Sequence, residues 1–163
     1  MSDFQKTIKE PVTLTGVGLH TGKETHLTFR PAPVDHGFKF QRVDLEGKPI
    51  VRVDVDNVID VSRGTTISEN GASVATIEHT LAALVGMEID NVLMELDGPE
   101  LPIMDGSSKL FVEALQKAGV ETQNKAREYF ELEDKLENIS GKVWRRRTHV
   151  RKVSNSNIEQ RRN

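Results

Sequence analysis

Apolar and polar residues alternate along the first third of the chain with the period of β-strands. The alternation is clearest in HLTFR (residues 26–30), which a proline-rich stretch follows, and in GFKFQRV (37–43). A period of two places every second side chain on one face, as in a strand that is buried on one side. Shorter strands are predicted at GTTIS (64–68), at DNVLMELDG (90–98) and near residues 128–133.

Two later stretches have the period of an α-helix. In ATIEHTLAALVG (75–86), one apolar stripe is formed by Ile77, Leu81, Leu84 and Val85. Thr76 is the predicted N-cap of this helix, and Gly86 is the predicted glycine that ends it. A second helix is expected to begin at Ser107 or Ser108 and to stop at Gly119.

Strands with two inserted helices favour an α+β fold. We expect a two-layer sandwich in which two helices cover one face of a single, mainly antiparallel sheet, as in the second domain of ribosomal protein S5. Aromatic residues make up only 5% of the chain, so the core is expected to be largely aliphatic. At 163 residues, the chain has the length of one domain with a short appendage.

Charge divides the chain into two parts. Residues 1–140 hold 14 Lys and Arg against 24 Asp and Glu, whereas residues 141–163 hold eight Lys and Arg against one acidic residue. Such a change within a short segment is typical of a separate element or a tail. We therefore expect a folded domain over residues 1–136 and a basic tail over residues 137–163 that is poorly ordered on its own.

Several features of the sequence favour a cytoplasmic protein. The chain contains no cysteine, which excludes disulfides and thiolate metal ligands. Its first ten residues, MSDFQKTIKE, are polar and lack the apolar stretch of a secretory signal. No run approaches the roughly 18 apolar residues that a membrane span requires.

Glu78 and His79 lie together at the start of the first predicted helix. With Ile77, Leu81 and Leu84 facing the core, both side chains must point elsewhere, because helical neighbours lie about 100° apart. The positive end of the helix dipole favours an ionised carboxylate and a neutral imidazole. A neutral imidazole can bind a metal ion, and an adjacent carboxylate can take a proton from metal-bound water. Alternatively, Glu78 satisfies helix amides and His79 lies at the edge of the sheet.

Two further stretches place polar residues in turns. TGVGLHTG (15–22) lacks the spacing of a P-loop or of a complete dinucleotide-binding motif, and predicts a tight β-turn with His20 exposed. GPELPIMDGSS (98–108) contains two prolines and an Asp-Gly turn before a helix. Asp105 is either a residue of that turn or a buried carboxylate that orients another group, and the local sequence favours the turn.

In this order, these stretches resemble a known family. TGVGLHTGK, RGTTI and TIEHTLAALVGMEIDNVLMELDGPELPIMDGSS are similar to the N-terminal half of UDP-3-O-acyl-N-acetylglucosamine deacetylase, the zinc hydrolase that commits precursors to lipid A. The resemblance covers roughly residues 5 to 133. It implies hydrolysis of the N-acetyl group of a UDP-sugar that carries a 3-O-hydroxyacyl chain, with Zn²⁺ as the cofactor. The acyl chain would allow peripheral contact with a membrane, and no nucleic acid is expected as a partner.

The resemblance also implies roles for individual residues. His79 is expected to bind zinc, and Glu78 is expected to act as the general base on zinc-bound water. His20 is expected near the substrate passage, and Asp105 matches a carboxylate close to the site. A loop that lines the entrance for the acyl chain is expected at Arg63, Gly64, Thr65 and Thr66.

Members of this family carry a second domain of similar fold, which completes the zinc site with a His-x-x-x-Asp pair and a further catalytic histidine. No Asp stands at the fourth position after any histidine of this chain, namely His20, His26, His36, His79 and His149. Catalytic zinc usually takes about three protein ligands. We therefore expect the missing second domain, or another chain, to complete the zinc site.

Three hypotheses are open from the sequence. The first is that the chain is part or a variant of the zinc deacetylase. The second is a non-catalytic domain that binds nucleic acid or another partner through the basic tail. The acidic body and the lack of an aromatic stacking platform argue against nucleic acid. The third is a foldable domain that carries the family motifs without activity of its own.

Overall fold

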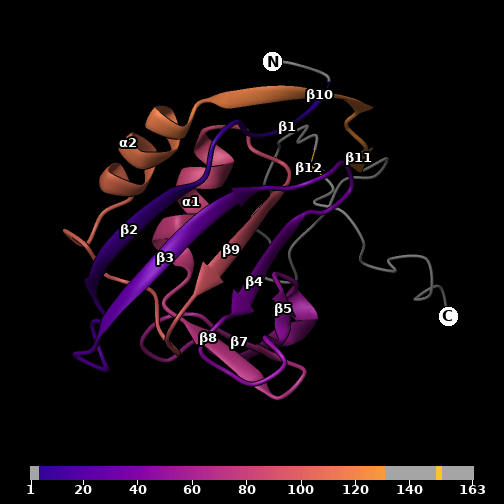
Figure 1. Ribbon diagram of the computed structural model, residues 1–163. Helices are drawn as coiled ribbons and strands as arrows, with labels where there is room; N and C mark the ends of the chain where they lie inside the picture. The colour runs from indigo at the N-terminus through magenta and orange to yellow at the C-terminus, as the bar shows by residue number, and fades with distance from the viewer. Residues whose placement is uncertain (1–3, 131–149, 152–163) are drawn as a thin grey trace, which may run out of the picture.

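The centre of the molecule is a five-stranded β-sheet. The structure, a computed structural model, describes residues 4–130 and 150–151 (Figure 1). The sheet has the strand order β2-β3-β9-β4-β5, and neighbouring strands are antiparallel except for β9 and β4, which are parallel. Its strands are β2 (Val12–Val17), β3 (Glu24–Pro31), β9 (Val92–Leu96), β4 (Phe38–Arg42) and β5 (Ile50–Arg52).

The alternating sequence pattern produces the two faces of this sheet. In β3, Leu27 and Phe29 are fully buried, whereas His26 and Arg30 are exposed. Strands β4 and β9 alternate in the same way. The strands predicted at residues 26–30, 37–43 and 90–98 are therefore confirmed. The largest fully buried side chains are those of Phe29, Phe40, Phe111, Ile8, Leu27, Ile67, Leu84, Ile89, Met94, Leu96, Leu101 and Leu115.

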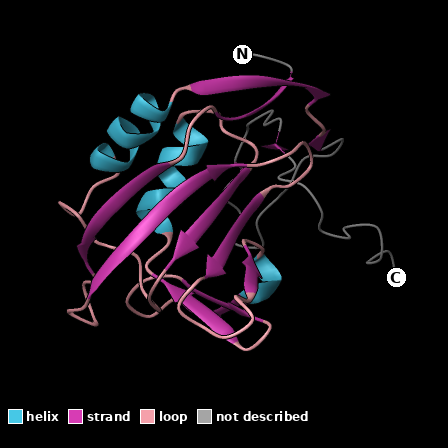
Figure 2. Cartoon of the chain, viewed as in Figure 1, coloured by secondary structure: helices cyan, strands magenta, loops and turns pink. Residues whose placement is uncertain are grey.

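Two helices, α1 (Glu78–Gly86) and α2 (Lys109–Ala118), lie together on one face of the main sheet (Figure 2). Helix α2 contacts both α1 and β2. As predicted, it begins after Ser108 and stops at Gly119, whose φ of 72° lies in the left-handed region that glycine tolerates. In the part of the chain that the structure describes, the arrangement confirms an α+β fold with two α-helices.

The predicted details of α1 are partly wrong. The N-cap position is taken by Ile77, while Thr76 has a φ of 60° and its hydroxyl points to another partner. Val85 was expected in the core but is 53% exposed, whereas Thr80 is buried. At about 100° per residue, the buried arc centres near Thr80, and Val85 falls outside it. Gly86 is the last helical residue, and the left-handed position after the helix belongs instead to Glu88, with φ 56°.

Within residues 4–130 and 150–151, the other strands form three smaller sheets, whereas the sequence predicted a single sheet. Strand β1 (Phe4–Ile8) pairs with β10 (Val120–Ala126), and β6 (Val58–Asp60), β7 (Thr66–Glu69) and β8 (Ala72–Ala75) form a three-stranded sheet. A short 3₁₀ helix, Val55–Asn57, precedes β6. The Asn70-Gly71 turn has positive φ at both residues, which joins β7 to β8 as a local hairpin. Local pairing of this kind separates the three strands from the main sheet.

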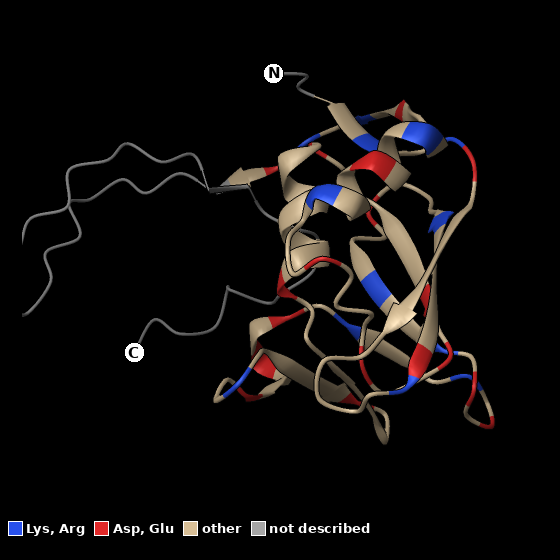
Figure 3. Cartoon of the chain, turned by 90° about the vertical axis from the view of Figure 1, so that its left-hand side faces the viewer, with Lys and Arg blue, Asp and Glu red and all other residues tan. Residues whose placement is uncertain are grey.

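The C-terminal predictions lie largely outside the described residues. The strand predicted near residues 128–133 is described as β11 (Tyr129–Phe130), which pairs with β12 (Val150–Arg151). The expected domain boundary at residue 136 and the rest of the basic tail lie outside the described residues. Over the described body, acidic and basic residues are interspersed in the view of Figure 3. None of its helices has the length and apolar character needed to cross a membrane.

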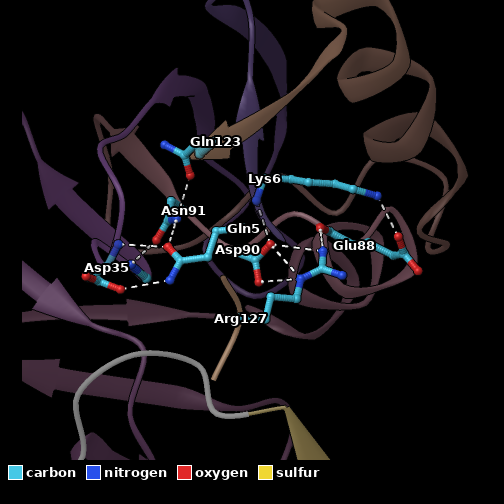
Figure 4. Close-up of polar contacts among 9 residues, drawn as sticks. Gln5, Lys6, Asp35, Glu88, Asp90, Asn91, Gln123 and Arg127 are labelled. Atoms are coloured by element: carbon cyan, nitrogen blue, oxygen red, sulfur yellow. Dashed lines mark hydrogen bonds and ion pairs between the residues drawn. The ribbon is translucent and has the colours of Figure 1, made fainter. Parts of the chain in front are cut away.

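A network of polar side chains connects β1 and β10 to the loop before β9 (Figure 4). We call it the Asp90–Asn91 network; it comprises Gln5, Lys6, Asp35, Glu88, Asp90, Asn91, Gln123 and Arg127. The Arg127 guanidinium donates to both carboxylate oxygens of Asp90, at 3.0–3.1 Å. The Asn91 amide nitrogen donates to Gln5 at 2.8 Å and to Gln123 at 2.7 Å. These bonds join segments that are far apart in the sequence. They lie at one end of the molecule.

Candidate functional site

The glycine-rich stretch forms the tight turn between β2 and β3 that the sequence predicts. The N–H of Gly18 donates to the carbonyl of Lys23 at 2.9 Å, and the N–H of Gly22 donates to the carbonyl of Gly18 at 3.0 Å. His20 is exposed in this turn, as expected. Its Nε2 lies 3.3 Å from the carbonyl oxygen of Arg63, so the turn reaches the loop before β7.

That loop lies against the start of α1. The N–H of Thr65 donates a hydrogen bond to Oε1 of Glu78, and the carbonyl of Thr65 accepts one from the N–H of Thr76 at 3.0 Å. A Cβ on Gly64 would lie 3.6 Å from the Thr76 hydroxyl and 3.7 Å from Glu78 Oε1. Thr66 follows as the first residue of β7. The predicted entrance loop and the predicted general base are therefore neighbours.

Glu78 and His79 form the first turn of α1 and point away from the core. Glu78 is exposed and His79 is half-buried. Burial works to raise the pKa of Glu78, but its own N–H, the hydroxyl and N–H of Thr65, and the nearby His79 together lower that pKa below its ordinary value. The positive end of the helix favours the same ionised form. Glu78 is therefore a carboxylate at neutral pH and can accept a proton.

A second carboxylate, that of Glu100, lies behind the turn and is only 1% exposed. It accepts hydrogen bonds from the N–H of His20 at 3.0 and 3.1 Å, from the N–H of Thr21 at 2.8 Å and from the hydroxyl of Thr76 at 3.0 Å. Burial works to raise the pKa of Glu100, but the bonds from Thr21, His20 and Thr76 lower it overall. Glu100 is thus held as a buried anion.

Sequence reasoning missed Glu100, although it had singled out the stretch GPELPIMDGSS. The available signal was an acidic residue between Pro99 on one side and Leu101 and Pro102 on the other. A charge in such an apolar context is rarely buried unless other groups bond to it. The bonding groups come from positions about 25 and 80 residues away, which the sequence pattern does not connect.

Asp105 lies outside this group of contacts. It is exposed in the turn before α2, where its Oδ1 accepts bonds from the N–H of Ser107 at 2.9 Å and from the Ser107 hydroxyl at 2.8 Å. These two bonds lower the pKa of Asp105. The structure therefore brings His20, the loop at residues 63–66 and Glu78 together, and gives Asp105 partners within its own turn.

A metal ion at this site would need more ligands than the described residues provide. A half-buried imidazole and an exposed carboxylate suit zinc chemistry. However, residues 4–130 and 150–151 contain no group of three or more His, Cys, Asp or Glu side chains that could hold a metal ion. Catalytic zinc usually takes about three protein ligands. The described residues alone do not fit the ion, and His79 is one candidate ligand.

An ionised carboxylate next to a half-buried histidine at the start of a helix suits the chemistry of a metal-dependent hydrolase. Comparison with known sequences gives the family. Residues 5–156 match the model of the family described as UDP-3-O-acyl N-acetylglycosamine deacetylase. The chain belongs to this family, as the motifs in its sequence had indicated.

Similar proteins include a deacetylase and two bifunctional enzymes. The chain is 47% identical over 133 residues to the UDP-3-O-acyl-N-acetylglucosamine deacetylase of Xanthomonas campestris, which covers 82% of this chain and 44% of the relative. It is 45% identical over 133 residues to the bifunctional enzyme LpxC/FabZ of Bacteroides thetaiotaomicron, and 47% identical to that of Chlorobaculum tepidum. Each match covers 82% of this chain, and 29% and 28% of those relatives. The chain therefore spans less than half the length of these relatives.

Proposed function

We propose that this chain carries the Glu78–His79 part of a zinc-dependent deacetylase. The proposed reaction is hydrolysis of the N-acetyl group of UDP-3-O-(3-hydroxyacyl)-N-acetylglucosamine, a step of lipid A biosynthesis. The observation that carries the proposal is the ionised, exposed Glu78, which the N–H of Thr65 holds beside His79 in a chain of the deacetylase family.

In this reaction, water adds to the acetyl carbonyl, the amide C–N bond breaks, and another group gives a proton to the departing amine, so that acetate and a free amine are released. Glu78 is the proposed base that takes the proton of the attacking water. Its lowered pKa keeps it in the proton-accepting form at neutral pH. His79 is the proposed zinc ligand of this chain, and the remaining ligands are proposed to come from a second domain or another chain.

The turn and the loop beside Glu78 are the proposed contacts for the substrate. His20 and the residues Arg63, Gly64, Thr65 and Thr66 come together around the same end of α1. Asp105 is kept as a proposed substrate contact on the family resemblance alone. The two helices on one face of the sheet support the S5-like sandwich as the proposed fold type.

The proposal can be tested in a chimera. The part of this chain that matches the Xanthomonas campestris deacetylase would replace the corresponding 133 residues of that relative. We expect the chimera to release acetate from the UDP-sugar substrate. Glu78→Gln should lower turnover by about 10²–10⁴-fold, the usual contribution of a general base.

Glu113→Gln provides a matched control, because Glu113 is an exposed helical carboxylate on α2. This variant should keep the turnover of the parent chimera. A folded chimera that is inactive, or one whose activity survives Glu78→Gln, would contradict the proposed function.

A further inference from the structure

Glu100 connects two segments of the chain that carry candidate site residues. One is the β2–β3 turn, whose His20 and Thr21 donate backbone N–H groups to its carboxylate. The other is the entry to α1, where the Thr76 hydroxyl donates to Oε1 at 3.0 Å, two residues before Glu78. The backbone of Glu100 forms a parallel bridge with Ala75. Both segments are therefore fixed to one buried side chain.

The surroundings are shaped to hold this carboxylate. A Cβ on Gly18 would collide with the Thr21 hydroxyl and would lie 2.6 Å from Glu100 Oε2, so the turn needs glycine there to leave room for the anion. Thr76 keeps its hydroxyl on Glu100 despite a φ of 60°, which β-branched residues rarely adopt. Strain of this kind persists only where the surrounding contacts impose it.

Hydrogen bonds from backbone N–H groups connect Thr76 in turn to Glu78, the proposed base. The N–H of Thr76 donates to the carbonyl of Thr65, and the N–H of Thr65 donates to Glu78. The path from Glu100 to Glu78 thus runs through two threonines that bond directly to each other. On the other side, His20 is 3.3 Å from the Arg63 carbonyl, which closes a ring of contacts around the loop.

We propose that Glu100 is a positioning residue that sets the placement of both His20 and Glu78 through these bonds. This role rests on the proposed function, in which Glu78 is the base. Glu100 itself is assigned no contact with the reacting atoms. The carboxylate holds the turn through two backbone amides and the start of α1 through Thr76. Without this anion, the two segments lose the side-chain bonds that they share, and the backbone bridges of Ala75 with Glu100 and of Gly18 with Pro102 remain.

The test is amide NMR spectroscopy on the full chain of 163 residues, which needs no turnover. In Glu100→Gln, an amide NH₂ faces N–H donors of the turn, so hydrogen exchange at Thr21 should rise by about tenfold. The amide signal of Thr65 should also shift, although the hydrogen bonds of Thr65 go to Glu78 and Thr76 and not to Glu100. Such a shift at a distance is the signature of positioning.

Matched variants separate positioning from general weakening. Thr76→Val removes the hydroxyl at constant shape and should shift Thr65, whereas Thr76→Ser keeps the hydroxyl and should leave Thr65 in place. Asp90→Asn removes the charge of another partly buried carboxylate, in the Asp90–Asn91 network, and should leave both Thr21 and Thr65 unchanged.

Two results would overturn the proposal. One is a Glu100→Gln variant whose changes stop at His20 and Thr21, because Glu100 would then only support the turn. The other is an equal shift of Thr65 in Asp90→Asn, which would indicate loss of stability everywhere. If Glu100→Gln does not fold, the comparison of Thr76→Val with Thr76→Ser tests the proposal instead. An inactive chimera would contradict the proposed deacetylase function, but it would not change the NMR evidence for the placement of these segments by Glu100.

Discussion

Two polar clusters of this molecule, the Asp90–Asn91 network and the candidate site, hold their carboxylates in different ways. In the Asp90–Asn91 network, Asp90 pairs with Arg127, and the two side chains are 11% and 4% exposed. At the candidate site, Glu78 and Glu100 receive bonds from N–H and hydroxyl groups. Within the described part of the chain, neither forms an ion pair with Lys or Arg.

The comparison separates carboxylates that stabilise the fold from carboxylates that can accept a proton or orient neighbouring groups. An aspartate paired with arginine is neutralised locally, and its oxygens are occupied by the guanidinium. Neutral donors leave the full negative charge in place while they fix its position. An exposed, fixed carboxylate such as Glu78 can accept a proton, and a buried one such as Glu100 can orient its neighbours. We therefore expect substitutions in the first cluster to affect mainly stability.

The largest stability effect is expected from breaking the buried ion pair. Arg127→Met should lower the free energy of unfolding by about 3 kcal/mol, because it removes the guanidinium that bonds to the largely buried carboxylate of Asp90. Urea denaturation measures the change. Arg30→Met is the control, since the Arg30–Glu95 pair lies 2.7 Å apart on the exposed sheet face and should contribute less than about 1 kcal/mol. Equal losses of unfolding free energy for the two variants would show that the Asp90–Arg127 pair stabilises the fold no more than an exposed ion pair does.

A smaller effect is expected in the glycine-rich turn. Gly18→Ala should cost about 2 kcal/mol, because its Cβ would force Glu100 and Thr21 apart. Gly22→Ala in the same turn should cost about 1 kcal/mol, since Gly22 has open space around it and only its φ of 64° disfavours a side chain. Thermal or urea denaturation would compare the two. A larger loss at Gly22 would mean that the turn does not need room for the carboxylate.

The smallest effect concerns acid stability. The pKa of Glu100 is lowered on folding from its ordinary value of 4.5, so its contribution is complete above that pH and is lost as pH falls through the folded value. The parent chain should therefore lose stability more steeply below about pH 4.5 than Glu100→Gln. Urea denaturation at several pH values measures both slopes. Parallel curves would show that Glu100 gains nothing from its ionised form.

Local pattern was enough to predict three strands of the main sheet, β3, β4 and β9, together with helix α2. Leu27 and Phe29 alternate with polar neighbours, and Gly119 marks the end of α2. The phase of α1 was not predictable, because Thr80 is buried and Val85 exposed through contacts with the rest of the fold. The spacing of apolar residues indicates which secondary structure a segment prefers. Tertiary packing then decides which side of a short helix faces the core.

The candidate site was predictable in part. Glu78, His79, His20 and the loop at residues 63–66 stood out through motif and resemblance, and all but His79 are joined by hydrogen bonds in the structure. Glu100 was missed because its partners lie far away in sequence. Asp105 was given a role by resemblance, while its observed bonds are those of a turn residue. Long-range hydrogen bonds to a buried charge leave no periodic trace in a sequence.

The most direct test of the central claim is the zinc content of the chimera with the Xanthomonas campestris relative. The parent chimera should bind about one zinc ion per chain, and His79→Ala should lose most of it, because zinc would lose one of about three protein ligands. His26→Ala is the matched control, since His26 lies on the face of the main sheet that points away from the two helices. Its Nδ1 is 2.8 Å from a carboxylate oxygen of Asp97. Full zinc content in His79→Ala would contradict the assignment of Glu78–His79 as part of a zinc-dependent hydrolase site.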